Sequence, residues 1–193
     1  MNFDNFIGND EIKNLLDNSI KQNNILHSYI FVGQKGIGKS IFAKQFAKMI
    51  LCTSKQKACN KCKSCIEFEN SNNPDISIIN PDGNNIKIEQ IRNLISKSSE
   101  KPIISDKKVY IINDSDYMTK EAQNSLLKTL EEPPSYLTII LICSNENKLI
   151  NTIKSRCTKI KFKPIQDMLL KQYMEENYQM KNITKETLKL FRR

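Results

Sequence analysis

The segment 33–40 has the residue types and the spacing of a phosphate-binding loop. It consists of Gly33, Gln34, Lys35, Gly36, Ile37, Gly38, Lys39 and Ser40, and fits the pattern G-x-x-x-x-G-K-[ST] at every fixed position. Glycines let backbone N–H groups turn toward phosphate oxygens, Lys39 would reach the outer phosphates, and the Ser40 hydroxyl would ligate magnesium. An apolar run at 28–32 precedes the segment and an amphipathic run at 41–50 follows it. We therefore predict that ATP or ADP binds here with Mg²⁺; the alternative is a chance glycine-rich turn.

Four of the six cysteines form a second group with chemical potential, and these four are Cys52, Cys59, Cys62 and Cys65. In a reducing cytosol such clustering favours metal ligation over disulfides. Tetrahedral zinc accepts four thiolates and then has no position open for chemistry. We therefore predict a structural Zn²⁺ held by all four; the alternative is that one or more of them is buried and free. Cys143 and Cys157 lie on or near later predicted strands and are expected to be small core residues.

The composition limits where and with what this chain works. Its 193 residues, 39% hydrophobic, suit one good-sized domain or one domain with the start of a second. There is no secretory signal and no apolar run near the roughly 18–20 residues of a membrane span, so we expect a cytoplasmic protein. The net charge of +9 comes from scattered lysines. This favours weak backbone contact with DNA within a larger assembly over specific DNA recognition.

Strands and helices alternate along the predicted chain. Strands are expected at 28–32, 75–79, 108–112, 138–143 and 158–162, and helices at about 9–20, 41–50, 88–95 and 122–130. Asn9 and the two acidic residues after it are expected to cap the first helix. This alternation predicts an α/β protein with a parallel sheet covered by helices on both faces. From about Pro164 the pattern becomes wholly helical and charged, which indicates the start of a second domain.

Several spaced motifs together resemble a known family. They are 27–31 running into the phosphate loop, the cysteine group, 109–112 followed by 116–119, 122–128, 130–134 and 155–157. Over about residues 3–164 the chain is similar to the AAA+ subunits of the bacterial DNA polymerase III clamp loader, gamma/tau and delta-prime, and is most like the delta-prime type.

The resemblance implies a domain organisation and a set of partners. It implies an AAA+ nucleotide-binding domain at 1–164, with a zinc module inserted at about 52–65. A helical lid domain would begin at 165–193 and be incomplete, and the third, collar domain of the family would be absent. The implied partners are the gamma/tau and delta subunits, with the sliding clamp contacted indirectly and primer-template DNA through the assembly.

The resemblance also carries roles for single residues. Ser155-Arg156-Cys157 resembles the motif whose arginine reaches a neighbouring subunit's ATP site, so Arg156 would act as a trans arginine finger. The alternative is a plain surface charge. Ser144 and Asn145 match the region where the family senses the γ-phosphate, although they could equally cap the next helix.

The sequence departs from the family pattern after the strand at 108–112. A hydrolytic AAA+ subunit has Asp-Glu there, one residue for magnesium and one for the attacking water, whereas this chain has Asn113-Asp114. The amide of Asn113 is a poorer ligand for a hard divalent cation than a carboxylate is. The carboxylate of Asp114 is one methylene shorter than that of a glutamate, so it would sit about 1 Å away from the water that it must orient. A one-residue shift would give Asp114 the metal role and leave Ser115 as the base, which is no better. We expect the chain's own ATPase to be weak or absent, as in a delta-prime stator.

Three other functions remain open from the sequence. A gamma/tau motor of the same complex would need the intact acidic pair. A P-loop phosphotransferase acting on a small molecule would have no use for the four cysteines or for Arg156. A zinc-dependent scaffold with a vestigial phosphate loop would bind no nucleotide.

Overall fold

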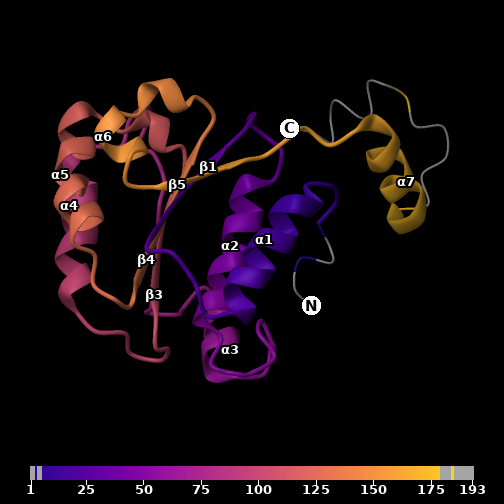
Figure 1. The fold of residues 1–193 in the computed structure, drawn as a ribbon, viewed down its shortest axis with the longest axis horizontal. Helices are drawn as coiled ribbons and strands as arrows, with labels where there is room; N and C mark the ends of the chain where they lie inside the picture. Colours follow the sequence, from indigo (N-terminus) through magenta and orange to yellow (C-terminus); the bar gives the residue numbers. More distant parts are fainter. Residues whose placement is uncertain (1–2, 4–5, 179–183, 185–193) are drawn as a thin grey trace.

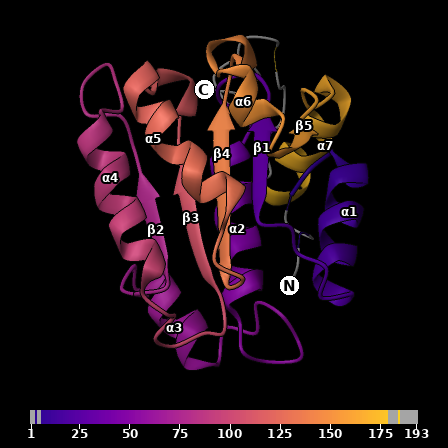
Figure 2. The same ribbon diagram turned by 60° about the vertical axis from the view of Figure 1, so that its left-hand side comes forward.

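The centre of the protein is a five-stranded, wholly parallel β-sheet (Figures 1 and 2). The structure is a computed structural model and describes residue 3, residues 6–178 and residue 184. The strands are β1 (Ser28–Val32), β2 (Ile76–Ile79), β3 (Lys108–Ile112), β4 (Leu137–Cys143) and β5 (Thr158–Lys161), in the order β2-β3-β4-β1-β5. The α/β class and the parallel sheet that the sequence predicts are confirmed.

Helices cover both faces of the sheet, so the protein has three layers. The helices are α1 (Asp10–Lys21), α2 (Lys39–Leu51), α3 (Lys63–Glu69), α4 (Ile88–Ser96), α5 (Lys120–Glu131), α6 (Asn151–Lys154) and α7 (Asp167–Tyr178). Short 3-10 turns lie at η1 (Lys97–Ser99), η2 (Ser115–Tyr117) and η3 (Glu146–Lys148). Figure 2 shows α4 and α5 in front of the sheet and α2 behind it. Within the described part of the chain, no helix has the length and apolar character to cross a membrane.

Two hydrophobic clusters, one on each face, hold these layers together. Behind the sheet, Phe42 and Phe46 of α2 pack on Tyr29 and Phe31 of β1. In front of it, side chains of α4, α5 and α6 pack on the other face of β1, β3 and β4. The central strands β3 and β4 are buried at every position. This is why they appear in the sequence as continuous apolar runs rather than alternating ones.

The strand order decides which loops meet. In β4, Cys143 pairs with Val32 of β1 and Leu141 pairs with Ile112 of β3. The three strands therefore end at the same edge of the sheet, and the segments that follow them lie side by side. In open parallel sheets, ligands bind outside the carboxyl ends of the strands.

Asn9 does not cap α1 as the sequence suggests. Its backbone is left-handed, with φ of 54°, and its side chain makes no capping bond. Instead, Asn9 Oδ1 accepts from Lys163 N at 2.8 Å and Nδ2 donates to Lys163 O at 3.1 Å. The amide thus pairs like a strand with the chain leaving β5, a long-range contact that local spacing does not encode.

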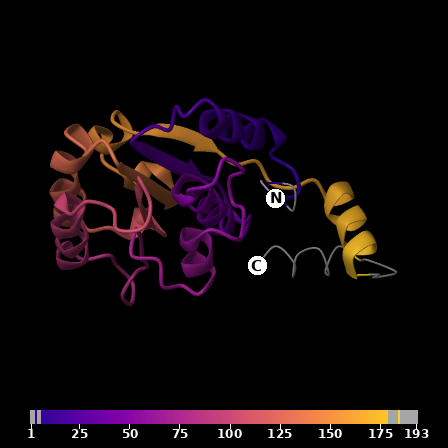
Figure 3. The same cartoon turned by 90° about the horizontal axis from the view of Figure 1, so that it is seen from below.

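The helix α7 extends to one side of the sheet (Figures 1 and 3). Its buried residues Leu170 and Met174 form a small cluster of their own with Ile7 and Ile165. The charged segment beginning near 164 is therefore helical over 167–178. Apart from residue 184, residues 179–193 lie outside the described residues.

A buried carboxylate organises the chain before β3. Asp75 is fully buried and accepts from the backbone N–H groups of Ile103, Ile104 and Ser105 at 2.6, 2.8 and 2.7 Å. The Ser105 hydroxyl in turn lies 3.1 Å from that of Ser64 in α3. Asp75 therefore ties the start of β2 to the loop that feeds β3.

Replacing Asp75 with Ala should destabilise the protein by about 2–4 kcal/mol, because three partly buried N–H donors lose their acceptor. Asp75→Asn, which keeps one acceptor oxygen, should cost less. Urea unfolding followed by circular dichroism measures the difference. Asp106→Asn, an exposed position in the same loop, serves as the control and should change stability by less than about 0.5 kcal/mol. Equal stability of the Asp75→Ala and Asp106→Asn variants would contradict this role.

Candidate functional site

The phosphate-type loop, residues 33–40, runs from the end of β1 into the first turn of α2, at the carboxyl ends of the strands. Gly36 and Gly38 have φ of 82° and 87°, a backbone region open mainly to glycine. Gly33 has no room for a side chain, since an added Cβ would lie 2.6 Å from Ile37 Cδ1 and 3.0 Å from Phe162 O. The first turn of α2 begins at Lys39, so the positive end of that helix faces the loop.

Lys39 lies inside this loop rather than in solvent. Its side chain is buried, and Nζ donates to the carbonyl oxygens of Gly33 and Gln34 at 2.7 Å each. Burial lowers the pKa of Lys39, while the charges of Cys143, Asp114 and Asp116 act in the opposite direction. The ammonium is thus held at the centre of the loop, where a phosphate group would meet it.

The segment after β3 lies against the start of α2. Ser40 Oγ donates to Asn113 Oδ1 at 2.6 Å, and Asn113 Nδ2 donates to Asn80 Oδ1 at 2.8 Å. The residue that faces the loop serine is therefore Asn113, not Asp114. Ser115 is buried and its hydroxyl donates to Ile142 O at 3.0 Å. The shifted alignment, with Asp114 on the metal and Ser115 as base, stays a prediction.

Asp114 and Asp116 play different structural parts. Asp114 is half-buried and has a left-handed backbone, with φ of 46°. Asp116 is buried, and its carboxylate accepts from Ser144 N at 3.4 Å and Asn145 N at 3.1 Å. Asp116 thus joins the end of β3 to the end of β4. Sequence reasoning gave Asp116 no role, because only the adjacency of the two strands reveals it.

The two residues at the end of β4 separate in role. Ser144 is exposed and follows Cys143, whose carbonyl accepts from Gly33 N at 3.3 Å, so it adjoins the phosphate-type loop. Asn145 caps the next turn, with Oδ1 accepting from Asn147 N at 3.0 Å. The capping alternative therefore describes Asn145, and Ser144 is the polar side chain left beside the loop.

A cavity of about 460 Å³ opens next to the loop. Its walls come from the N-terminal segment, the loop, α2 and α7, and include Phe6, Gly36, Ile41, Ile165, Leu170 and Tyr173. Its lining is mostly apolar, with one tyrosine and one glutamine, as is usual for pockets that hold small organic ligands. The phosphate-type loop and an apolar pocket are therefore contiguous.

Arg156 lies at the amino ends of the strands, opposite to the end where the phosphate-type loop lies. Its carbonyl accepts from the hydroxyl of Ser28, the first residue of β1, at 2.7 Å, and Thr158 pairs with Tyr29. The phosphate-type loop begins beyond the far end of that strand of 5 residues, which spans about 16 Å. The guanidinium points to Glu131 at the end of α5. Arg156 is thus not part of the chain's own nucleotide-type site.

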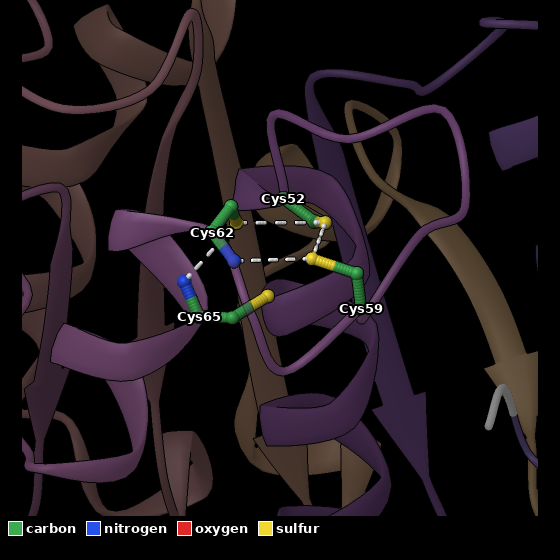
Figure 4. A group of neighbouring side chains, drawn as sticks. All are labelled: Cys52, Cys59, Cys62 and Cys65. Atoms are coloured by element: carbon green, nitrogen blue, oxygen red, sulfur yellow. Dashed lines mark hydrogen bonds between the residues drawn. The ribbon is translucent and has the colours of Figure 1, made fainter.

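The four clustered cysteines converge on one point (Figure 4). Their Sγ atoms all lie within 4.8 Å of one another, so Cys52, Cys59, Cys62 and Cys65 can ligate one metal ion. The N–H of Cys62 donates to Cys59 Sγ at 3.3 Å, and the N–H of Cys65 donates to Cys62 Sγ at 3.4 Å. The second of these bonds caps α3, a helix that its few apolar residues do not predict. Cys143 and Cys157 are buried core residues, as expected.

The environment of the cluster favours thiolates at two positions. Burial alone would raise the pKa of Cys62, but hydrogen bonds from Cys65 and Thr53 outweigh it and bring the pKa to about 6. Backbone hydrogen bonds, the largest from Lys61, lower the pKa of Cys59. Burial raises the pKa of Cys65. Thiolates are the form in which cysteine binds metals.

The chain is similar in sequence to subunits of DNA polymerase III. The profile of a family described as "DNA polymerase III, delta subunit" matches residues 8–166. The chain is 39% identical over 166 residues to DNA polymerase III subunit delta' of Bacillus subtilis, covering 86% of this chain and 50% of that protein. It is 37% identical over 175 residues to subunit gamma/tau of Mycoplasma pneumoniae, covering 90% of this chain and 26% of that protein. The chain thus spans about a quarter to a half of these relatives' lengths.

Similarity to solved structures identifies the fold. A gamma subunit-related protein of DNA polymerase III from Thermotoga maritima superposes with a TM-score of 0.58 at 22% identity, covering 83% of this chain and 49% of that one. The RuvB Holliday junction branch migration motor of the same organism superposes with a TM-score of 0.56 at 15% identity, covering 88% and 50%. With the parallel sheet and its flanking helices, these likenesses show an α/β fold of the AAA+ type.

Replacing Asp116 with Ala should loosen the end of β4, because two N–H groups lose their buried acceptor. We expect amide hydrogen exchange at Ser144 and Asn145 to accelerate by about 10- to 100-fold. The exchange rates of the cysteine-cluster amides should stay as in the parent protein. Asp82→Ala, a substitution at an exposed site, is the control and should change neither these rates nor those at 144 and 145. Unchanged protection at 144 and 145 would show that Asp116 does not hold this segment.

Proposed function

Because this chain belongs to the family of DNA polymerase III clamp-loader subunits of the delta-prime and gamma/tau type, we propose that it acts as a delta-prime-like stator. In this proposal it binds nucleotide, hydrolyses it slowly or not at all, and supplies Arg156 to the ATP site of a neighbouring subunit during sliding-clamp loading. Its partners would be gamma/tau and delta, with the clamp and primer-template DNA met through the assembly. The cell compartment would be the cytoplasm.

The observation that carries the proposal is the contact between Ser40 and Asn113. An intact phosphate-type loop faces an amide where a hydrolytic site needs a carboxylate. Residues 33–40 would hold the phosphates of ATP or ADP, with Lys39 on the outer ones. Mg²⁺, when bound, would neutralise phosphate charge, and the Ser40 hydroxyl would be its ligand. The neighbouring apolar cavity has a volume suited to a nucleoside, and Ser144 remains the candidate for a phosphate sensor.

The place of Arg156 supports a role between subunits. An arginine at the amino edge of the sheet is about one strand length from the chain's own nucleotide site. It can therefore stabilise the charge of a transferring phosphoryl group only in another molecule. The alternative, a gamma/tau motor, has support from a gamma/tau relative at 37% identity. Asn113 weighs against it.

The cysteine cluster fits structural zinc. Zn–S bonds of about 2.3 Å in a tetrahedron place sulfurs about 3.8 Å apart. Cys52 Sγ lies 3.6 Å from Cys59 Sγ and 3.8 Å from Cys62 Sγ. Lys48 of α2 contacts Asn60 of this module and Glu69 at the end of α3, and a bound ion would hold the segment 52–65 in shape beside α2. In the same proposal the AAA+ domain spans 1–164, and a helical lid domain begins at 165.

We expect this chain to bind nucleotide without hydrolysing it at an appreciable rate. A fluorescent ATP analogue should bind the purified protein, and Lys39→Ala should weaken binding by about 10- to 100-fold through loss of charge-assisted hydrogen bonds. Lys44→Ala, an exposed lysine on α2, is the matched control and should bind as the parent does. Phosphate release should stay near background. Rapid turnover by the chain alone would favour the motor, and no binding at all would favour a vestigial loop.

The trans role of Arg156 can be measured in a reconstituted complex. The full-length chain is assembled with gamma/tau subunits in which only the neighbour facing Arg156 keeps a working phosphate loop. Arg156→Ala should then lower single-turnover ATP hydrolysis by about 10³-fold, the usual worth of an arginine finger, while nucleotide binding to this chain is unchanged. Lys154→Ala, a nearby surface lysine, should have little effect. An undiminished rate with Arg156→Ala would refute the stator.

Metal analysis tests the cysteine cluster. The purified protein should contain about one zinc per chain, and Cys65→Ser should lower both zinc content and melting temperature, since structural zinc contributes directly to folding. Cys157→Ser, which replaces a buried cysteine outside the cluster, is the control, and this variant should bind as much zinc as the parent protein. A strong chelator should lower the melting temperature of the parent protein. Zinc-free protein of undiminished stability would exclude a structural site.

A further inference from the structure

Arg156 is held at its own edge of the sheet by three contacts. Its Nη2 lies 2.7 Å from Glu131 Oε1, and its Nη1 donates to Thr152 O at 2.9 Å and to Ser155 Oγ at 3.4 Å. Two of these partners belong to α6 and its end, just before Arg156 in the chain. Glu131 comes from the end of α5, a different element, and is therefore the contact that sets the direction of the guanidinium.

The pair contributes little to folding, but it gives the guanidinium a preferred direction. The side chains of Arg156 and Glu131 are 33% and 48% exposed, and ion pairs at such exposure add little to stability. A free arginine, in contrast, samples many rotamers, and its planar fork recognises anions well only when it is oriented. The carboxylate at the negative end of α5 adds to the field that retains a cation there.

The three contacts leave some N–H donors of the guanidinium available to another partner. Within the described part of the chain they use three of its five N–H donors, so two remain for an anion from outside. Arg156 can thus meet a phosphate without first leaving Glu131.

We propose that Glu131 is a positioning residue for Arg156: it pre-orients the guanidinium toward the γ-phosphate in the neighbouring subunit. This inference rests on the trans role proposed above and adds the residue that makes the finger effective. Glu131 itself touches neither nucleotide nor the reacting atoms, and acts only through Arg156.

The test compares two adjacent glutamates in the reconstituted complex with one working neighbouring site. Glu131→Gln keeps the size of the side chain and removes its charge, and Glu132→Gln makes the same change at the next, exposed position. Glu131→Gln should lower the kcat of the neighbour's ATPase by roughly three- to tenfold, since a misaligned group loses transition-state contact. KM, the melting temperature and complex assembly should stay unchanged. Glu132→Gln should leave all four quantities as in the parent.

A double variant separates positioning from a merely structural role. In an Arg156→Ala background, Glu131→Gln should cause no further loss of kcat, because the two residues act through one group. An additional loss, an unchanged kcat or a raised kcat for Glu131→Gln alone would each overturn the inference; a raised kcat would mean that Glu131 restrains the finger. If Arg156→Ala itself has no effect, the trans role fails first, so the two failures are distinguishable.

Discussion

The shared direction of the five strands is the constraint on which the rest of the protein depends. Because β3, β4 and β1 are neighbours and parallel, the segments after them meet at one edge. That edge collects the phosphate-type loop, Asn113 and Ser144. The return connections must run back to the other edge, and Arg156 follows one of them. The parallel direction of the strands thus places the candidate nucleotide site at one end of the sheet. It places Arg156, proposed to act on the nucleotide of a neighbouring subunit, at the other end.

Much of this arrangement could be predicted from the sequence. Strands buried on both faces give long apolar runs, and the four cysteines are close in sequence, so their convergence needs little tertiary information. The phosphate-type loop is equally local. Strand ends were shifted by about one residue, as with β4, which begins at Leu137 rather than Thr138.

Apart from α3, which the nearby Cys62 caps, the main features that sequence reasoning missed depend on contacts between distant segments. Asp75 and Asp116 are buried carboxylates that accept backbone N–H groups from 28 to 30 residues away. Asn9 carries a good capping side chain, but its amide pairs with Lys163. In each case the residue type indicates hydrogen bonding, and only the packed fold shows with which partner. The same holds for Glu131, whose contact with Arg156 joins the ends of two helices.

The backbone at Asp114 limits which side chains the turn after β3 accepts. Its φ of 46° lies in a region that aspartate and asparagine tolerate better than other residues with a side chain. A glutamate at this position would meet backbone strain as well as a new side-chain length, and Asn113 would still be an amide. An Asp-Glu pair at these positions would therefore need two substitutions, Asn113→Asp and Asp114→Glu, and the second would also strain the backbone. The turn after β3 thus favours a short polar side chain at position 114 over a glutamate.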